Sequence, residues 1–224
     1  MKIAIVDKSK YLKNNINKEI KKFNLKIDNK NPDIVISHGG DGTFFIAERK
    51  YPGIPKLLVR DSKVCHLCSP TSREELFKKL KNKKYSKINC MKLQTRNLLA
   101  VNDIIIRNKD LTEALRFKIK INSQPYSEEL IGDGLVIATQ FGSTGYFNSI
   151  TRTSFKKEKI GIAFNNVKNR KKPIILNNNS KIEVKIIRGI AQLSADNNKK
   201  IIILKPNNKV LIKKAKAKTI LLKL

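Results

Sequence analysis

The fold is decided by the stretch Asp33-Ile34-Val35-Ile36-Ser37-His38-Gly39-Gly40-Asp41-Gly42-Thr43. Its apolar centre is short and continuous, which is typical of a buried strand. Three glycines follow, and glycine lets a chain turn tightly where other residues cannot. We therefore expect a strand over Asp33–Ser37, a tight turn, and a helix from about Thr43 to Arg49.

Strands and helices alternate through the rest of the first half. We expect strands at Lys2–Asp7 and Pro55–Val59, and a helix within Tyr11–Phe23. A further helix is expected from a capping Ser69 to about Leu80, because Ser, Pro and acidic residues are typical of helix starts. Strand–helix alternation predicts a parallel sheet with helices on its faces, here an N-terminal Rossmann-like α/β domain over residues 1–90.

From about Tyr85 onward the sequence changes to short β-rich runs separated by turn signals such as Asp196-Asn197-Asn198. This pattern predicts a C-terminal layered β-sandwich domain over residues 91–224, so the fold class is α/β plus β. The strands that we expect are Asn97–Arg107, Arg116–Ile121, Leu135–Thr139, Ile160–Phe164, Lys181–Ile187, Ala191–Ala195, Ile201–Leu204, Val210–Lys213 and Thr219–Leu222.

The composition is strongly basic, with 48 Lys and Arg residues against 18 Asp and Glu residues and a formal net charge of +30. Such a charge suggests anionic partners. However, the basic residues run from Lys2 to Lys223 instead of forming one arm, and most are lysine, not the arginine favoured for reading bases. We interpret the charge as a general bias of composition and expect no specific nucleic-acid binding.

Three further features favour a cytoplasmic protein. No stretch approaches the roughly 20 apolar residues that a membrane helix needs. The N-terminal run Lys2–Asp7 is too short for the apolar region of a signal peptide. The three cysteines cannot form a disulfide framework.

The turn Gly39–Thr43 carries the first chemical signal. Backbone N–H groups at a glycine-rich turn and a helix N-terminus suit phosphate oxygens. A carboxylate beside bound phosphates would either hold Mg²⁺ or accept a proton from an attacking hydroxyl, so Asp41 is a candidate for both roles. The alternative is a structural turn with Asp41 as a helix cap. His38 could touch a phosphate or serve the structure.

A second glycine cluster spans Gly132–Ser149, where a strand leads into a turn and a helix expected near Ser143. Its small hydroxyl residues could approach a ribose or phosphate, or could simply cap the helix. Tyr146 offers a flat face for stacking on a base. Upstream, Asn102-Asp103 lies inside a β run, where it is either a bulge or turn or a pair of ribose and amide ligands.

The segment Cys65-His66-Leu67-Cys68 could be half of a zinc site or a redox pair. The other residues of those types are Cys90 and His38, and His38 adjoins the glycine-rich turn. We therefore favour packing of small apolar thiols and expect no metal site made of protein side chains.

These elements, in this order, resemble the NAD kinase family. The resemblance runs from Gly39-Gly40-Asp41-Gly42-Thr43 through Asn102-Asp103 to Asp133-Gly134 and Gly142-Ser143-Thr144-Gly145-Tyr146. The first motif alone also occurs in lipid kinases of the diacylglycerol and sphingosine type, whereas the last is more specific. The resemblance implies transfer of the γ-phosphoryl group of ATP, or of polyphosphate, to the adenosine ribose 2′-hydroxyl of NAD, with Mg²⁺ required. It also implies a homodimer or homotetramer.

The resemblance also implies roles for individual residues. Asp41 would be the general base. The phosphate-binding turn would comprise Gly39, Gly40, Gly42 and Thr43. The residues that would bind NAD are Gly42, Asn102, Asp103, Asp133, Thr144, Gly145, Tyr146 and Ser149, some of them from a neighbouring subunit.

The sequence departs from the family pattern in four places. Gln140-Phe141 stands where the family usually has Pro and a small hydroxyl residue, and Val64–Leu67 replaces a Leu-Gly-Phe-Leu loop. Asp196-Asn197 replaces a late Asp-Gly, and Asn165-Asn166 replaces a Pro-His pair. Two alternatives stay open: a lipid or sugar kinase of the same superfamily, and a non-catalytic nucleotide- or nucleic-acid-binding protein.

Overall fold

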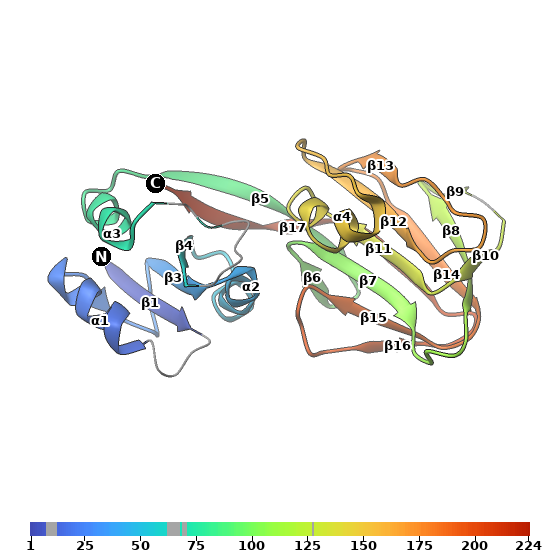
Figure 1. Ribbon diagram of the computed structural model, residues 1–224, viewed down its shortest axis with the longest axis horizontal. Coiled ribbons are helices and arrows are strands. Elements are labelled where there is room, and N and C mark those ends of the chain that lie inside the picture. Colours follow the sequence, from blue (N-terminus) through green and yellow to red (C-terminus); the bar gives the residue numbers. More distant parts are fainter. Residues whose placement is uncertain (8–12, 62–67, 69–70, 127) are drawn as a thin grey trace. The chain divides into compact units, whose positions relative to one another are not determined.

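The computed structural model describes residues 1–7, 13–61, 68, 71–126 and 128–224. The chain forms two compact units (Figure 1). Unit 1 comprises Met1–Cys90 and Lys218–Leu224, and unit 2 comprises Met91–Ala217. The last seven residues, which we expected in the second domain, therefore belong to unit 1. None of the described helices is long and apolar enough to cross a membrane.

Unit 1 contains a parallel sheet in the order β2-β1-β3-β4, continued by the C-terminal end of β17. Its strands are β1 (Lys2–Asp7), β2 (Lys26–Ile27), β3 (Ile34–Gly39), β4 (Lys56–Arg60) and the end of β17 (Lys209–Lys223). Its helices are α1 (Lys13–Lys22), α2 (Asp41–Lys50) and α3 (Arg73–Lys81).

Helices cover both faces of this sheet, as strand–helix alternation predicts. On one face, Ile16 and Ile20 of α1 and Phe77 of α3 pack with alternate residues of β1, β3 and β4. On the other face, Ala47 of α2 packs with Ala4 and neighbouring residues. Both layers bury apolar side chains, so β3 is covered on both sides and needs the continuous apolar run seen in the sequence.

Unit 2 is a sandwich of two sheets. One sheet has the order β10-β8-β14-β17, with β9 beside β8, and with β5 joining β17 to β6. The other has the order β13-β12-β11-β7-β15-β16. Their strands are β5 (Ser86–Thr95), β6 (Leu98–Ala100), β7 (Asp103–Asn108), β8 (Leu115–Ile121), β9 (Gln124–Pro125), β10 (Leu130–Gly132), β11 (Gly134–Ala138), β12 (Lys159–Asn165), β13 (Ile174–Asn177), β14 (Ile182–Arg188), β15 (Ala191–Ala195) and β16 (Ile202–Leu204).

The core of unit 2 lies between these sheets and is built from alternate residues of each strand. In β11, Leu135 and Ile137 point into this core, whereas Val136 and Ala138 face the other way. There they pack against Phe147 of α4 (Tyr146–Thr151). The side chains of a strand alternate between faces, so one strand serves both layers. The expected fold class, α/β plus a layered β-sandwich, is confirmed.

Several element boundaries differ from expectation. The two strands expected at Val210–Lys213 and Thr219–Leu222 are one strand, β17. Helix α3 begins at Arg73 and its cap is Ser72, whose Oγ accepts the Glu75 N–H at 3.3 Å. The proposed cap Ser69 lies outside the described residues.

Candidate functional site

The glycine-rich turn of unit 1 connects β3 directly to α2. Gly39 has a φ of +147°, and a Cβ added there would lie 2.4 Å from Thr43 Oγ1. Both facts demand glycine at this position. Gly40 then precedes the helix, and its carbonyl oxygen accepts the Thr43 N–H at 2.9 Å. The turn is therefore closed by residues of the motif itself.

Asp41 is the first residue of α2, which begins two residues earlier than expected. Its side chain is half-buried, so it retains access to solvent. The N-terminus of a helix carries partial positive charge, which favours a carboxylate there. Gly40, the residue before it, provides no side-chain cap. Thr43, in contrast, is 2% exposed, so its hydroxyl supports the turn against Gly39.

His38 is fully buried at the C-terminal end of β3. Its Nδ1 lies 2.9 Å from Asp7 Oδ2 at the end of the neighbouring strand β1, and Arg73 Nη1 lies 3.5 Å from its Nε2. These contacts occupy both ring nitrogens. Of the two roles considered for His38, the structure supports the structural one.

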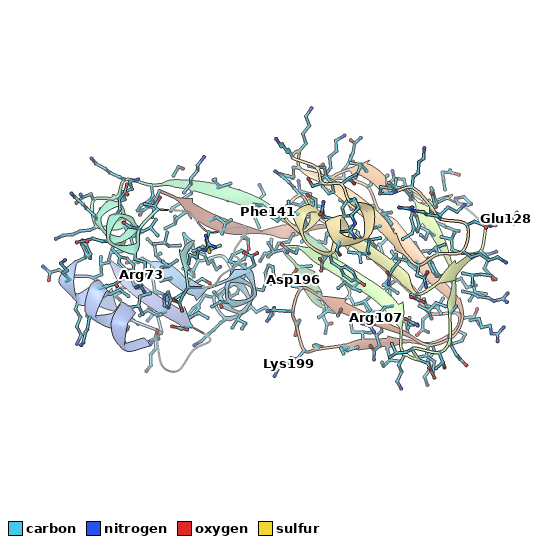
Figure 2. All side chains as sticks on the ribbon, viewed as in Figure 1. Arg73, Arg107, Glu128, Phe141, Asp196 and Lys199 are labelled. Carbon is cyan, nitrogen blue, oxygen red and sulfur yellow. The ribbon has the colours of Figure 1, made fainter. Side chains whose placement is uncertain are left out.

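In unit 2, the Asn102-Asp103 pair lies where the expected run Asn97–Arg107 breaks between β6 and β7. The break is a bend stabilised by Asp196, which follows β15 and is labelled in Figure 2. The Asp196 carboxylate accepts three consecutive backbone N–H groups, from Val101 at 2.9 Å, Asn102 at 2.8 Å and Asp103 at 3.2 Å. The Asp196 N–H donates in turn to the Asp103 carbonyl oxygen at 3.0 Å.

Thr139 holds the same segment from the other side. Its Oγ1 donates to the Val101 carbonyl oxygen at 2.5 Å, and its backbone N–H donates to the Asn102 carbonyl oxygen at 2.8 Å. The same hydroxyl accepts the N–H groups of Phe141 at 3.1 Å and Gly142 at 3.3 Å. Thr139 thereby ties the Asn102 segment to the turn that carries the second glycine motif.

Gly142 makes this contact possible, because a Cβ added there would lie 2.2 Å from the Asn102 carbonyl oxygen. Within the described residues, the side-chain oxygen of Asn102 is buried and has no hydrogen-bond partner. A buried polar atom without a partner is costly and calls for an explanation. An N–H donor supplied by a ligand would satisfy it.

The carboxyl group of Asp103 is buried, with 7% of the residue exposed. Desolvation, and secondarily the nearby Asp196 carboxylate, raise the pKa of Asp103 to about 7. A protonated carboxyl can donate a hydrogen bond, whereas an ionised one only accepts. Near neutral pH, Asp103 is therefore poised between the two forms.

The hydroxyl residues of the second glycine motif do not cap α4. They bond backward instead: Thr144 Oγ1 donates to the Phe141 carbonyl oxygen at 3.1 Å, and Ser149 Oγ donates to the Tyr146 carbonyl oxygen at 2.7 Å. The helix expected near Ser143 is a 3₁₀ turn over Gly142–Thr144, followed by α4 from Tyr146. Thr144, Tyr146 and Ser149 are exposed and Gly145 is half-buried, so all four are accessible to a ligand.

Asp133 lies at the other end of β11 from this cluster. It precedes Gly134, which pairs with Arg107, whereas Thr139 follows Ala138, which pairs with Asp103. Six residue steps of extended chain span about 20 Å at roughly 3.3 Å each. Within one chain, the structure thus brings Asn102, Asp103 and Gly142–Tyr146 together but leaves Asp133 apart, bonded to Asn166 Nδ2 at 3.1 Å.

The described residues contain no group of three or more His, Cys, Asp or Glu side chains that could hold a metal ion. Cys65, His66 and Leu67, on which the zinc and redox interpretations partly rest, lie outside the described residues. Sequence reasoning missed two residues that shape the site, Thr139 and Asp196. The signal for Asp196 was present, since it occupies the position of the family's late Asp-Gly.

Residues 101–224 match the family model for the ATP-NAD kinase C-terminal domain. The NAD kinase of Rickettsia bellii is 27% identical over 154 residues, covering 65% of this chain and 60% of the relative. That of Bacteroides fragilis is 30% identical over 154 residues, covering 63% and 53%. The matched regions therefore span less than two thirds of these relatives.

Two solved structures share the fold. A crystal structure of an NAD kinase from Archaeoglobus fulgidus in complex with ATP has a TM-score of 0.87 at 22% identity, covering all of this chain and 94% of that one. Yeast NADH kinase complexed with NADH has a TM-score of 0.86 at 14% identity, with coverages of 100% and 83%. With the family match over more than half of its length, the chain belongs to the NAD kinase family.

Proposed function

We propose that this protein is an NAD kinase, which transfers the γ-phosphoryl group of ATP to the adenosine ribose 2′-hydroxyl of NAD to form NADP. The observation that carries the proposal is the family match over residues 101–224. This range includes the Asn102–Asp103 bend and the Gly142–Tyr146 turn, which Thr139 ties together.

Asp41 is our candidate for the general base. A ribose hydroxyl is a weak nucleophile at neutral pH, and a positioned carboxylate that accepts its proton contributes roughly 10²–10⁴-fold. Asp41 meets the structural demands of this role because it is fixed in the first turn of α2 and remains accessible. The alternative role, that of a helix cap, is not needed to explain its position, since it lies inside the helix.

The turn Gly39–Thr43 is our candidate for the phosphate site. Its glycines keep side chains away from the backbone, and the N-terminus of α2 favours anions. Mg²⁺, when bound to the phosphates, would neutralise part of their charge. The protein fits such an ion, because Mg²⁺ is commonly held by one or two carboxylates together with substrate phosphates. Asp41 is the carboxylate of this turn, so holding the ion is the alternative to its role as general base.

On the acceptor side, we assign NAD to Asn102, Asp103, Gly145 and Tyr146, with Thr144 and Ser149 beside them. The exposed Tyr146 ring can stack on a base. Asp133 is too far along β11 to join this group within one chain. We therefore propose that Asp133 serves the site of a second copy in a homodimer or homotetramer.

The test is formation of NADP from NAD with Mg²⁺-ATP, detected with an NADP-specific dehydrogenase, with parallel reactions containing polyphosphate or no metal. Asp41→Asn should lower turnover by at least roughly 10²-fold while NAD binding is retained. The matched control is Asp33→Asn, at the opposite end of β3, where the carboxylate accepts the Lys2 N–H at 2.8 Å. Its turnover should stay within about twofold of the wild type.

Near-wild-type turnover of Asp41→Asn would remove Asp41 from the base role. If the folded wild-type protein forms no NADP with either donor but still binds ATP, then either the acceptor is another alcohol or the protein binds nucleotide without catalysis. Lipids in vesicles and free sugars would be screened next, which tests the lipid- or sugar-kinase alternative.

A row of lysines supports polyanion binding as a second candidate function. Lys185 of β14 pairs directly with Lys118 of β8 on one side and with Lys209 of β17 on the other. Like charges placed directly opposite each other destabilise a sheet, so a bound anion would relieve the row. Binding to double-stranded DNA that weakens steeply between 50 and 200 mM salt, as in counterion release, would support this function.

A further inference from the structure

Every backbone N–H and carbonyl group of the bend at Val101–Asp103 has a hydrogen-bond partner. Its three N–H groups all donate to Asp196, with Val101 on Oδ2 and with Asn102 and Asp103 on Oδ1. Its three carbonyl oxygens accept from Thr139 Oγ1, Thr139 N and Asp196 N respectively. Two residues, distant in sequence, therefore satisfy all six backbone polar groups of a segment of which only Asp103, the first residue of β7, lies in a strand.

Asp196 itself has a positive φ, +47°. A non-glycine residue in this region stores backbone strain unless its surroundings compensate, although Asp and Asn tolerate it best. The compensation here is the set of hydrogen bonds to the bend. The strained backbone aims the carboxylate at the N–H groups, so the conformation and the contacts depend on each other.

The result of this arrangement is a fixed Asn102. Its backbone N–H and carbonyl groups are both used, by Asp196 and Thr139, and Gly142 closes against its carbonyl oxygen. Its side-chain oxygen, buried and without a partner among the described residues, is what remains for a ligand. A backbone held in this way loses little conformational entropy when a ligand binds to the Asn102 side chain, which favours affinity.

We propose that Asp196 is a positioning residue of the nucleotide site, which acts by holding the Val101–Asp103 bend so that Asn102 is presented to the acceptor substrate. This inference rests on the proposed function, since the substrate is taken to be NAD. It assigns a role to the Asp of the Asp196-Asn197 pair, at the position where the sequence departs from the family's Asp-Gly. Asp196 acts through Asn102 and is not a catalytic residue.

The first measurement is amide hydrogen exchange of the full chain, followed residue by residue by NMR. In Asp196→Ala, the amides of Val101, Asn102 and Asp103 should exchange at least 10-fold faster than in the wild type. Asp196→Asn gives a sharper pattern. Its amide oxygen can replace Oδ1 and keep the bonds from Asn102 and Asp103, while its NH₂ group then faces the Val101 N–H. In that variant, Val101 alone should lose protection.

The second measurement is NAD affinity by calorimetry, with steady-state kinetics. Asp196→Ala should weaken NAD binding and raise KM for NAD at least 10-fold, with kcat within about threefold, because a positioning contact serves ground state and transition state alike. Asp196→Asn should restore most of the affinity. The matched control is Asp110→Ala, which removes a carboxylate that accepts the Thr112 N–H at 2.9 Å in another loop of unit 2. It should leave the bend and NAD binding unchanged.

The outcomes separate this inference from the proposed function. Unchanged exchange at Val101–Asp103 in both Asp196 variants would show that Asp196 does not hold the bend. Faster exchange with unchanged NAD affinity would reduce Asp196 to a structural role and overturn the proposal. If the wild-type protein binds no NAD, then the proposed function fails as well, and the exchange data alone decide whether the bend depends on Asp196. Asp196→Asn keeps the test decisive should Asp196→Ala not fold.

Discussion

Replacing Asp103 by Asn should stabilise the protein at neutral and alkaline pH. The Asp103 carboxyl group is buried beside Asp196, and its pKa is raised from 3.8 to about 7. Between these two values the folded protein holds a proton that the unfolded chain has released. The stability of the wild type therefore falls as the pH rises through this window, and the loss is complete above the folded pKa. A salt-bridged carboxylate with a lowered pKa behaves in the opposite way.

The magnitude follows from the shift. A rise of about 3 pH units, at roughly 1.4 kcal/mol per unit, corresponds to a penalty of ~4 kcal/mol once Asp103 is ionised in the folded state. Of this, roughly 2–3 kcal/mol develops between pH 5 and pH 8. Asn has nearly the same size and does not titrate. We therefore subtract the unfolding free energy of the wild type from that of Asp103→Asn. This difference should increase by roughly 2–3 kcal/mol between pH 5 and pH 8.

Urea unfolding of both proteins at pH 5, 6, 7 and 8 measures the difference, and taking the difference cancels the titration of all other groups. The control is Asp110→Asn, because hydrogen bonds from the Thr112 N–H and hydroxyl lower the pKa of Asp110. Its difference from the wild type should be constant above pH 5. If the Asp103→Asn difference is equally flat, then Asp103 is ionised throughout and the reasoning from its burial is wrong.

Two further substitutions test packing. Gly142→Ala would place a Cβ 2.2 Å from the Asn102 carbonyl oxygen and should lower the free energy of unfolding by about 1–3 kcal/mol. The control Gly53→Ala has nothing within 4 Å of its Cβ and a φ of +77°, so it should cost only about 1 kcal/mol. Equal losses of stability in the two variants would contradict the steric account. Lys56→Met should cost about 3–5 kcal/mol because it removes the ion-pair partner of the buried Glu48 carboxylate. The double variant with Glu48→Gln should recover most of that loss in urea unfolding, and failure to do so would refute the pairing argument.

The elements of unit 1 could be predicted because their signals are local. The apolar run of β3 and the glycines that follow it specify a strand and a tight turn without reference to any distant residue. The same is true of most strands in unit 2, where turn residues separate short apolar runs. The strand β17 shows the limit of such reasoning. Its centre, Lys213-Lys214-Ala215-Lys216-Ala217-Lys218, contains only lysine and alanine, and alanine gives too weak an apolar signal to join the two expected runs.

The sequence offered a turn at Asn102 as one alternative but could not decide for it, because the residues that stabilise the bend lie far away in the sequence. The Val101 N–H bonds to Asp196, 95 residues later, and the Val101 carbonyl oxygen to Thr139, 38 residues later. The sequence showed only two polar residues inside a β run, which fits a bulge or turn as well as it fits a ligand pair. The burial of His38 has a similar origin, since its partner Asp7 is its register neighbour in the parallel pair β1 and β3.

The structure shows why the bend is a suitable place for a binding site. A residue within a strand has its backbone groups committed to neighbouring strands and its side chain to one face of the sheet. At the bend, Asp196 and Thr139 take over the backbone groups, so leaving the ladder exposes no unsatisfied N–H or carbonyl group. Asn102 then lies outside the strand, while its backbone N–H and carbonyl groups remain hydrogen-bonded. Polar side chains that look misplaced inside a β run, together with a distant Asp or Thr able to satisfy the backbone, are thus a physical signature worth seeking in other β-sandwich proteins.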